Sequence, residues 1–349
     1  MELVNLLRKH SRRLLFTTPS HSQKTFIFKK LANLYKLDIS ETDTHNPVDV
    51  LKKAEHNAAK IYGVKQTKFL TNGSSSGIIT AVLACVNRGD KILLWNNAHP
   101  CHKNAAKLAG ADIITYDVPE IADWGVPQAV TSDILKPYLL NYKIKAVIIT
   151  SPTYEGYAAN IKEIKDLCTK YNCYLIADEA HGALYPFSNR LPESAVNIAD
   201  FTVQSLHKTA GGLNPTALIH TNTDLDINKA LNLINTTSPS YPLLASVEYN
   251  ISYLNSARGK KKLNLLIDEL ENLKKQCPDI RFGGDDITKL LIKYDKLSGE
   301  ELSQILYEKY NIEDEKTNPV STLLLCGIGT SSKKIKALHT ALNSIVKKY

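Results

Sequence analysis

The sequence predicts an α/β protein built around a mainly parallel β-sheet, with a second, smaller α/β domain toward its carboxyl end. From about residue 66, short apolar runs alternate with amphipathic helical stretches, a pattern typical of a parallel sheet covered by helices. No long Pro/Gly/Ser linker, low-complexity tract or internal repeat interrupts it. After Tyr241 a long helical stretch precedes a strand-helix-strand-helix order, which predicts the second domain.

Each strand of the larger sheet is predicted from an apolar run that ends at a turn. These runs lie before Asn72-Gly73 and at 91–95, 111–116, 145–150, 173–180 and 199–205. Helices are expected from the Asn72-Gly73 turn through Val86 and near 160–171. The second domain is expected to hold a helix at about 242–275, the strand KLLIKYD, a helix at 298–310, the strand STLLLCGIG and a last helix. The predicted divisions are an N-terminal segment 1–45, a large domain 46–245 and a small domain 246–349.

Composition excludes several classes of protein. The 349 residues are 43% hydrophobic and 22% charged, as in ordinary globular chains. The net charge of +8 comes from scattered Lys and Arg, which favours a solvated surface over a nucleic-acid-binding face. The six cysteines form no CxxC pair, which is typical of reduced thiols. We find no signal-peptide pattern and no apolar run long enough to span a membrane, so a cytoplasmic protein is expected.

The segment TNGSSSG, residues 71–77, is a candidate phosphate site. A strand turns there through Asn72-Gly73 into a helix that opens with three serines. Such a helix start offers free backbone N–H groups and the positive end of the helix dipole. A serine N-cap after a glycine turn is the simpler alternative. The segment has no Walker lysine and no GxGxxG motif, so a nucleotide triphosphate site is not expected.

Two strand ends carry further candidate groups. Asp178 and Glu179 end the apolar run CYLIAD, at the position where open α/β sheets place ligand-binding side chains. Lys208 follows the strand ADFTVQS, next to His207 and before a Thr-Ala-Gly-Gly turn. A lysine in an apolar site has a lowered pKa and can form an imine with an aldehyde. A surface cap for the acids and a solvated lysine are the alternatives.

The segment NNAHPCHKN, after the strand at 91–95, contains His99 and His102. Either ring could stack on an aromatic cofactor or transfer protons, and a buried, hydrogen-bonded histidine is the ordinary alternative. No metal site is expected, because His-x-x-His has no evident third ligand. Together, a phosphate site, a ring stacker, an acid and a lysine are the groups that pyridoxal 5'-phosphate (PLP) requires.

In these motifs the chain resembles the Orn/Lys/Arg decarboxylases, a family of fold-type I PLP enzymes. The matching segments follow the family's order over almost the whole chain: TPSHSQ (18–23), DISETDTHNP (38–47), FLTNGSSSG (69–77), HPCHKN (99–104), SPTYEG (151–156), LIADEAHGA (175–183), SLHKTAGG (205–212), TTSPSYPLLAS (236–246), TKLLI and LSGEEL. The resemblance implies a seven-stranded large-domain sheet and PLP as cofactor.

The resemblance also assigns roles to individual residues. Lys208 matches the lysine that binds the cofactor aldehyde, Asp178 the partner of the pyridine nitrogen, and His102 the histidine that stacks on the ring. The implied phosphate ligands are Ser74, Ser75 and Ser205. His207 matches a family histidine near the phosphate and substrate, His181 of the DEAHG motif is a further expected cofactor-binding residue, and His207 or Lys208 is the expected proton donor.

The segment that contains Thr237 and Ser238 matches one that can reach the neighbouring subunit in fold-type I dimers, so a homodimer is implied. The sequence departs from the family at Ser20 and Lys24, where the family motif usually has glycines. We also find no counterpart of the extra C-terminal domain of long family members, so the chain is expected to be a short form.

The resemblance implies decarboxylation of lysine, ornithine or arginine to the amine. Another PLP reaction, an aminotransferase or lyase activity, is the first alternative, because the cofactor site alone does not choose which bond breaks. No arginine follows Arg281, which weighs against the carboxylate clamp of an aspartate-type aminotransferase. A catalytically silent PLP-binding homologue is the second alternative.

Overall fold

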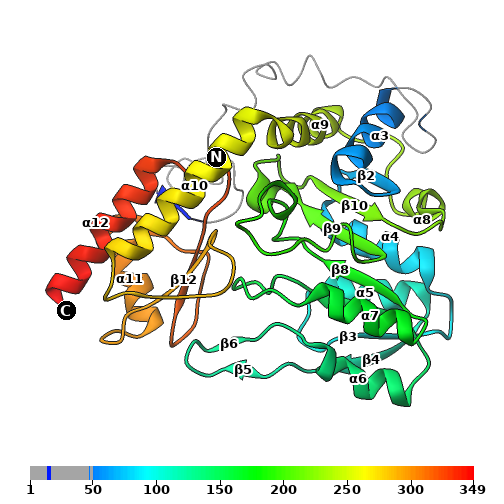
Figure 1. Ribbon diagram of the computed structural model, residues 1–349, viewed down its shortest axis with the longest axis horizontal. Helices are drawn as coiled ribbons and strands as arrows, with labels where there is room; N and C mark the ends of the chain where they lie inside the picture. The colour runs from blue at the N-terminus through cyan, green and yellow to red at the C-terminus, as the bar shows by residue number, and fades with distance from the viewer. Residues whose placement is uncertain (1–13, 17–46, 48–49) are drawn as a thin grey trace, which may run out of the picture.

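The computed structural model describes residues 14–16, 47 and 50–349, and it contains two main sheets (Figure 1). The larger sheet has the order β2-β10-β9-β8-β7-β3-β4, counted over these residues. Its strands are β2 (Gln66–Leu70), β3 (Lys91–Trp95), β4 (Asp112–Tyr116), β7 (Ile144–Thr150), β8 (Tyr174–Asp178), β9 (Phe201–Ser205) and β10 (Ala217–Thr221). Of these seven strands, β10 runs antiparallel to the other six, which are parallel to one another. The predicted mainly parallel, seven-stranded sheet is therefore confirmed for the described part of the chain.

Helices cover both faces of this sheet, so its central strands are apolar on both sides. Along β7, Ala146 and Ile148 belong to one core cluster, whereas Val147 and Ile149 belong to another. Alternate side chains of a strand point to opposite faces, which makes a doubly covered strand a continuous apolar run. The helices of this part are α3 (Val50–Tyr62), α4 (Gly73–Cys85), α5 (Pro100–Ala109), α6 (Ser132–Asn141), α7 (Ile161–Lys170) and α8 (Ile227–Asn232).

Helix α4 lies very close to the sheet because of Gly77. A Cβ atom at this position would lie 2.7 Å from Val203 Cγ1 and 2.8 Å from Leu70 Cδ1. The absence of a side chain therefore lets the first turn of α4 sit directly against β2 and β9. This contact fixes the position of the serines that open the helix.

The smaller sheet is antiparallel and has the order β11-β12-β15-β14. It packs with the helices α10 to α12 to the left of the larger sheet in Figure 1. The elements are α10 (Ala257–Gln276), β11 (Arg281–Gly283), β12 (Lys289–Lys293), α11 (Gly299–Tyr310), β14 (Lys316–Thr317), β15 (Thr322–Leu325) and α12 (Ser332–Lys348). Two short pairs complete the topology: β1 (Leu14–Leu15) with β13 (Ile312–Glu313), and β5 (Glu120–Ile121) with β6 (Val126–Pro127).

The long helix expected at about 242–275 is two helices, α9 (Tyr241–Asn255) and α10. Ser256 separates them with an extended backbone, and its Oγ accepts a hydrogen bond from the N–H of Gly259. The boundary predicted at 245/246 falls inside α9. Because Val247, Ile251 and Leu254 of α9 pack in the core of the larger sheet, we propose that the small domain starts at Ser256.

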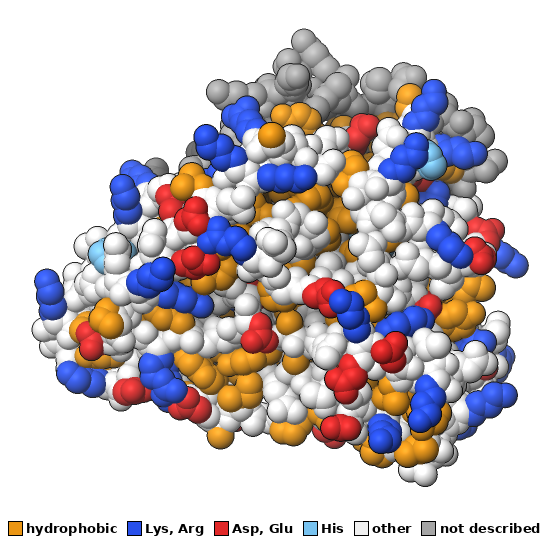
Figure 2. Space-filling view, in the orientation of Figure 1, with side chains coloured by type: hydrophobic (Ala, Val, Ile, Leu, Met, Phe, Trp, Pro, Cys, Tyr) orange, Lys and Arg blue, Asp and Glu red, His pale blue; other side chains and the backbone are white. Residues whose placement is uncertain are grey.

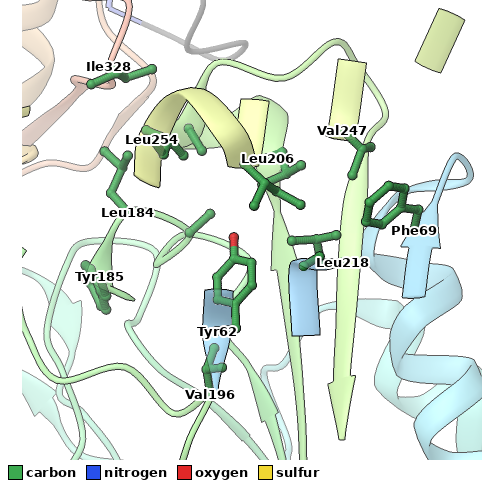
Figure 3. Packing of buried hydrophobic residues seen from close by; sticks show 14 of the residues in the cluster. Tyr62, Phe69, Leu184, Tyr185, Val196, Leu206, Leu218, Val247, Leu254 and Ile328 are labelled. Atoms are coloured by element: carbon green, nitrogen blue, oxygen red, sulfur yellow. The ribbon is translucent and has the colours of Figure 1, made fainter. Parts of the chain in front are cut away.

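Figure 3 shows the core cluster that underlies α9 and the segment after β9. Leu206 lies in it among Leu218, Val247 and Leu254. Ala210 belongs to the same cluster and is fully buried. The segment that contains Lys208 is thus anchored in the core on both sides of that lysine.

Several sequence predictions concern residues that the structure does not describe. The segments 18–23 and most of 38–47, the positions Ser20 and Lys24, and nearly all of the N-terminal segment 1–45 lie outside the described residues. Among the described helices, none is both long and apolar enough to cross a bilayer. On the face seen in Figure 2, Lys and Arg side chains are interspersed with Asp and Glu.

Candidate active site

A pocket of about 510 Å³ lies at the carboxyl edge of the larger sheet. Trp95, Thr150 and Asp178, the last residues of β3, β7 and β8, line it together with Ser74 of α4 and Lys208. Because parallel strands end at the same edge of a sheet, side chains that are far apart in sequence meet there. The small sheet contributes Lys316 to the same lining. The pocket therefore forms where the two sheets meet.

Asp178 lies in the pocket wall and is only 6% exposed. Its Oδ2 lies 2.8 Å from His102 Nε2, and its Oδ1 accepts a hydrogen bond from the N–H of Ala180 at 3.1 Å. Burial alone would raise the pKa of this carboxyl, but the hydrogen bond and charge of His102, the charge of Lys208 and the Ala180 N–H together hold it below its ordinary value. Asp178 is thus a carboxylate near neutral pH, with lone pairs left to accept a further N–H from the pocket.

His102, which the resemblance implied as the stacking residue, and His99 lie in different surroundings. His102 is fully buried, points its ring edge at Asp178 and is not among the residues that line the pocket. His99 lines the pocket and caps α5, with its Nδ1 accepting the N–H of Cys101. Burial lowers the pKa of His99, so its ring is neutral near pH 7. His99 is the N-cap of α5, Pro100 is its first residue, and His102 lies in its first turn.

Lys208 lies in a single π-helical turn, Leu206–Ala210, directly after β9. The turn is fixed by hydrogen bonds from Ile328 N–H to Thr209 O and from Asn250 Nδ2 to Ala210 O. Gly211, with φ +89°, ends it in the left-handed region that favours glycine. Lys208 is partly buried and its side chain lines the pocket. Burial lowers the pKa of its amine, against the opposing charge of Asp178.

The two histidines near Lys208 differ in position. His181 is buried in the pocket lining, with Nε2 3.1 Å from Lys208 Nζ. His207 is half-buried, is absent from the lining and donates from Nδ1 to the carbonyl of Thr216 at 3.2 Å. The structure therefore brings His181, rather than His207, to the amine.

The three serines that are candidate phosphate ligands have different surroundings. Ser74 lines the pocket at the start of α4, and the first turn of that helix contains no acidic residue. Ser75 hydrogen-bonds to the Cys101 thiol. Ser205 is fully buried at the end of β9, and its hydroxyl has no hydrogen-bond partner among the described residues.

Four other buried polar atoms around the pocket also have no partner in the described part of the chain. They are Thr150 Oγ1, Glu155 Oε2, Thr209 Oγ1 and His102 Nδ1. Buried polar groups are nearly always hydrogen-bonded in folded proteins. Apart from the Glu155 oxygen, which can only accept a hydrogen bond, these groups and Ser205 lie beside the start of α4 and the amine of Lys208 and fit a polar ligand that carries an anionic group. The donor set is the one that PLP needs.

Thr237 and Ser238 lie in an exposed segment between α8 and α9 and are not among the residues that line the pocket. Thr236 stabilises this segment by accepting the N–H of Ser238 at its Oγ1. Exposure leaves both side chains available to another molecule.

Sequence reasoning did not assign a role to Tyr154, Glu155, Lys289 or Lys316. Glu155 is 2% exposed, and its Oε1 accepts a hydrogen bond from Lys316 Nζ at 2.7 Å in the pocket. The Tyr154 ring packs edge-on against His181 at 4.7 Å between centroids. Both residues lie in the SPTYEG segment, whose match to the family could have indicated that they belong to the site. Lys289 and Lys316 reach the site only through the packing of the small sheet.

One group in the described chain has the composition of a metal site: Cys101, His102 and Asp178, with ligand atoms within 4.8 Å of one another. Burial raises the pKa of the Cys101 thiol to about 12, so this side chain is not a thiolate near neutral pH, the form that binds metals. The hydrogen bond between His102 and Asp178 accounts for the closeness of the other two groups. We assign no metal to this cluster.

Comparison with known proteins identifies a family and a fold. A family model described as the Orn/Lys/Arg decarboxylase major domain matches residues 3–281. An arginine decarboxylase of Bacillus anthracis is 29% identical over 377 residues, which cover 98% of this chain and 76% of that protein. The solved constitutive lysine decarboxylase of Escherichia coli superimposes with a TM-score of 0.78 at 20% identity, over 99% of this chain. A structure described as SPT with PLP has a TM-score of 0.72 at 14% identity, over 96% of this chain and 87% of that one.

The chain spans 60% of the length of the solved Escherichia coli lysine decarboxylase and 55% of that of Francisella novicida. The structural likeness establishes the fold of the fold-type I PLP enzymes, and the matched model covers most of the chain. This protein therefore belongs to the Orn/Lys/Arg decarboxylase family.

Proposed function

We propose that this protein binds PLP and decarboxylates a basic amino acid to its amine. The observation that best supports the proposal is the meeting of Lys208, Asp178 and Ser74 from three separate elements in one pocket of about 510 Å³. When bound, PLP supplies a ring that takes up the electron pair left by bond cleavage at the substrate α-carbon. The residues described below would hold the cofactor and the substrate.

Each group in the pocket has a distinct proposed part. The Lys208 amine would hold the cofactor covalently. Asp178, kept ionised by its partners, would accept the N–H of the pyridine ring. The N-terminus of α4 with Ser74 would bind the phosphate, since a helix start without acidic residues favours an anion. The ring of His99, which lines the pocket, would lie against the cofactor.

Lys208 is also the better-supported proton donor for the α-carbon. Its amine lies in the pocket, whereas His207 is outside the lining and uses Nδ1 on Thr216 O. A proton donor must come within hydrogen-bond reach of the carbon that it protonates. His207 is therefore the weaker of the two candidates.

Glu155 supports a basic substrate. Its Oε2 is buried and has no partner among the described residues, although the side chain lines the pocket. A buried carboxylate oxygen is costly unless it accepts a charged hydrogen bond. The side-chain cation of lysine, ornithine or arginine would provide one. The pocket lining contains no arginine, and Arg281 binds Asp123 instead, so an aminotransferase-type carboxylate clamp is not favoured.

The purified protein should carry PLP on Lys208 and release cadaverine, putrescine or agmatine from one of the three basic amino acids. Borohydride reduction should fix the cofactor on the Lys208 peptide, and Lys208→Ala should abolish both the label and the product. Mass spectrometry and product chromatography measure the two results. A label on another lysine would refute the assignment, and a label on Lys208 without amine product would point to another PLP reaction.

Replacing the two histidines separately should distinguish their roles. His99→Ala should weaken PLP binding by about 1 kcal/mol, roughly fivefold in Kd, if its ring packs on the cofactor. His102→Ala should instead raise the pKa of Asp178, because the hydrogen bond that lowers it is lost, and so move the acid limb of the pH-rate profile to higher pH. Fluorescence titration and rate profiles test this. The reverse outcome would restore His102 as the stacking residue.

Glu155→Gln should raise KM for the basic substrate at least tenfold, because a charge-assisted hydrogen bond contributes about 1.5–3 kcal/mol. The effect on kcat should be smaller, since Glu155 is proposed to bind the substrate side chain and not the reacting carbon. Steady-state kinetics measures both constants. Glu308→Gln, on the exposed side of α11, is the control. An unchanged KM in Glu155→Gln would contradict the role.

We also propose that the protein is a homodimer in which Thr237 and Ser238 reach the partner's site. Two inactive parents, Lys208→Ala and a double Thr237→Ala/Ser238→Ala variant, should give partly active hybrids when mixed, because each hybrid contains one complete site. Activity assays after subunit exchange test the prediction. Full activity of a protein that light scattering shows to be monomeric would refute it.

A further inference from the structure

His181 lies between two lysine amines. Its Nε2 is 3.1 Å from Lys208 Nζ, and its Nδ1 is 2.9 Å from Lys289 Nζ. The three side chains come from the loop after β8, the turn after β9 and the first residue of β12. They form one buried chain of nitrogen atoms that leads away from the pocket amine.

Hydrogen bonding limits the charges that this chain can hold. A neutral imidazole donates from one nitrogen and accepts at the other, whereas an ammonium group can only donate. Two ammonium groups facing the same ring would leave one imidazole N–H pointing at a donor. Burial, followed by the charges of Lys289 and Lys208, lowers the pKa of His181 well below its usual range, so the ring is neutral. At least one of the two lysines is then a neutral amine.

Lys289 is built into the site through Gly156. Lys289 has no exposed surface, and a Cβ at residue 156 would lie 2.9 Å from its Cδ. Gly156, at φ +99°, leaves the slot through which the lysine stem passes. The Nζ of Lys289 also contacts the carbonyl of Tyr154 at 3.1 Å and lies 5.7 Å from the centroid of that ring. Because Lys289 is enclosed in this way, its amine contacts two hydrogen-bonding partners, His181 Nδ1 and the carbonyl of Tyr154.

The surrounding charges allow both forms of Lys289. Burial and the charge of Lys208 favour its neutral form, while Asp286, Glu155 and Glu315 favour the ammonium form. The balance lowers its pKa to about 8, within reach of neutral pH.

Ionisable groups near Lys208 and His181 likewise favour either the charged or the neutral form of each side chain. Asp178, Cys101 and Glu315 favour a charged Lys208. His207 and His99 oppose charge on His181. These are the ionisable groups that bear on the Lys208–His181–Lys289 chain.

We propose that Lys289 is a positioning residue that stores the proton of Lys208 through His181, so that Lys208 can act as a neutral amine. A proton passes from the Lys208 ammonium to His181 Nε2, while the proton on Nδ1 passes to the Lys289 amine. The imidazole changes tautomer, and the total charge is unchanged. This inference rests on the proposed role of Lys208, because an amine must be neutral to attack a carbonyl carbon.

The test measures the free amine of Lys208 directly and does not depend on turnover. The full-length protein is treated with hydroxylamine to remove any bound aldehyde and dialysed. It is then labelled with trace acetic anhydride between pH 7 and 11, and the Lys208 peptide is quantified by mass spectrometry. Only neutral amines react, so the profile reports the protonation of Lys208. Far-UV circular dichroism and melting temperature check the fold of each variant.

In Lys289→Met, labelling of Lys208 at pH 8 should fall roughly tenfold, because the amine that takes up the Lys208 proton through His181 is gone and Lys208 retains its proton. Lys293→Met removes a cation from the same strand, one that pairs with Asp123, and should leave the profile unchanged. If Lys289→Met does not fold, His181→Ala cuts the same chain and should lower the labelling in the same direction.

An unchanged Lys208 profile in a folded Lys289→Met or His181→Ala protein would overturn the proposal and leave Lys289 a structural residue only. The outcome is separate from the proposed function, because labelling needs neither PLP nor substrate. Even if the protein decarboxylates nothing, its Lys289→Met variant could still show the predicted fall in Lys208 labelling. An active enzyme could lack that fall.

Discussion

The hydrogen bond between Asp178 and His102 is the interaction around which the pocket is arranged. A carboxylate that is 6% exposed needs partners, and Asp178 has His102 on one oxygen and the Ala180 N–H on the other. The bond fixes the first turn of α5 against the end of β8. That turn in turn sets His99 on the pocket wall. A single buried charge therefore determines which of two nearby imidazoles faces the ligand space.

The second constraint is the contact between the two sheets. The carbonyl of Gly156 accepts the N–H groups of Asp285 and Asp286, and Tyr185 donates its hydroxyl to Asp286 Oδ2 at 2.9 Å. These bonds join the loop after β7 and the 3-10 turn after β8 to the segment before β12. This junction places Lys289 next to His181. Lys316, in β14, lies next to Glu155. The surroundings of the Lys208 amine thus include residues from both sheets, although Lys208 itself follows a strand of the larger sheet.

The sequence predicted those features that are fixed by short-range patterns. Apolar runs bounded by turns located six of the seven strands of the larger sheet, because a doubly covered strand is apolar throughout. Strand β10 was missed, as its short run after Pro215 follows the glycine turn too closely to stand out. The break at Ser256 was missed because the apolar periodicity continues across it, and a serine cap is a weak signal inside such a stretch.

For the site, motif order predicted that Lys208, Asp178 and Ser74 share one pocket, and all three line the pocket at the carboxyl edge of the larger sheet. It assigned the stacking role to His102, but which of the two histidines faces the pocket depends on where α5 begins, and this start is not visible in the motif. Lys289 was beyond reach for a different reason. In the run TKLLI it has the sequence context of a strand residue, and its contact with His181 joins positions 108 residues apart. Only the packing of the small sheet against Gly156 makes it a buried amine.

The charges of the pocket also limit which ligands it can accept. The start of α4 favours an anion, because its first turn has free N–H groups and no acid. Glu155, in the same lining, has an unpaired oxygen within the described residues that favours a cation. A ligand set with a phosphate and a basic side chain satisfies both groups, whereas an acidic substrate would place like charges together at Glu155. Under the proposed function, the electrostatics of the pocket would therefore select against acidic amino acids even before any reacting bond is considered.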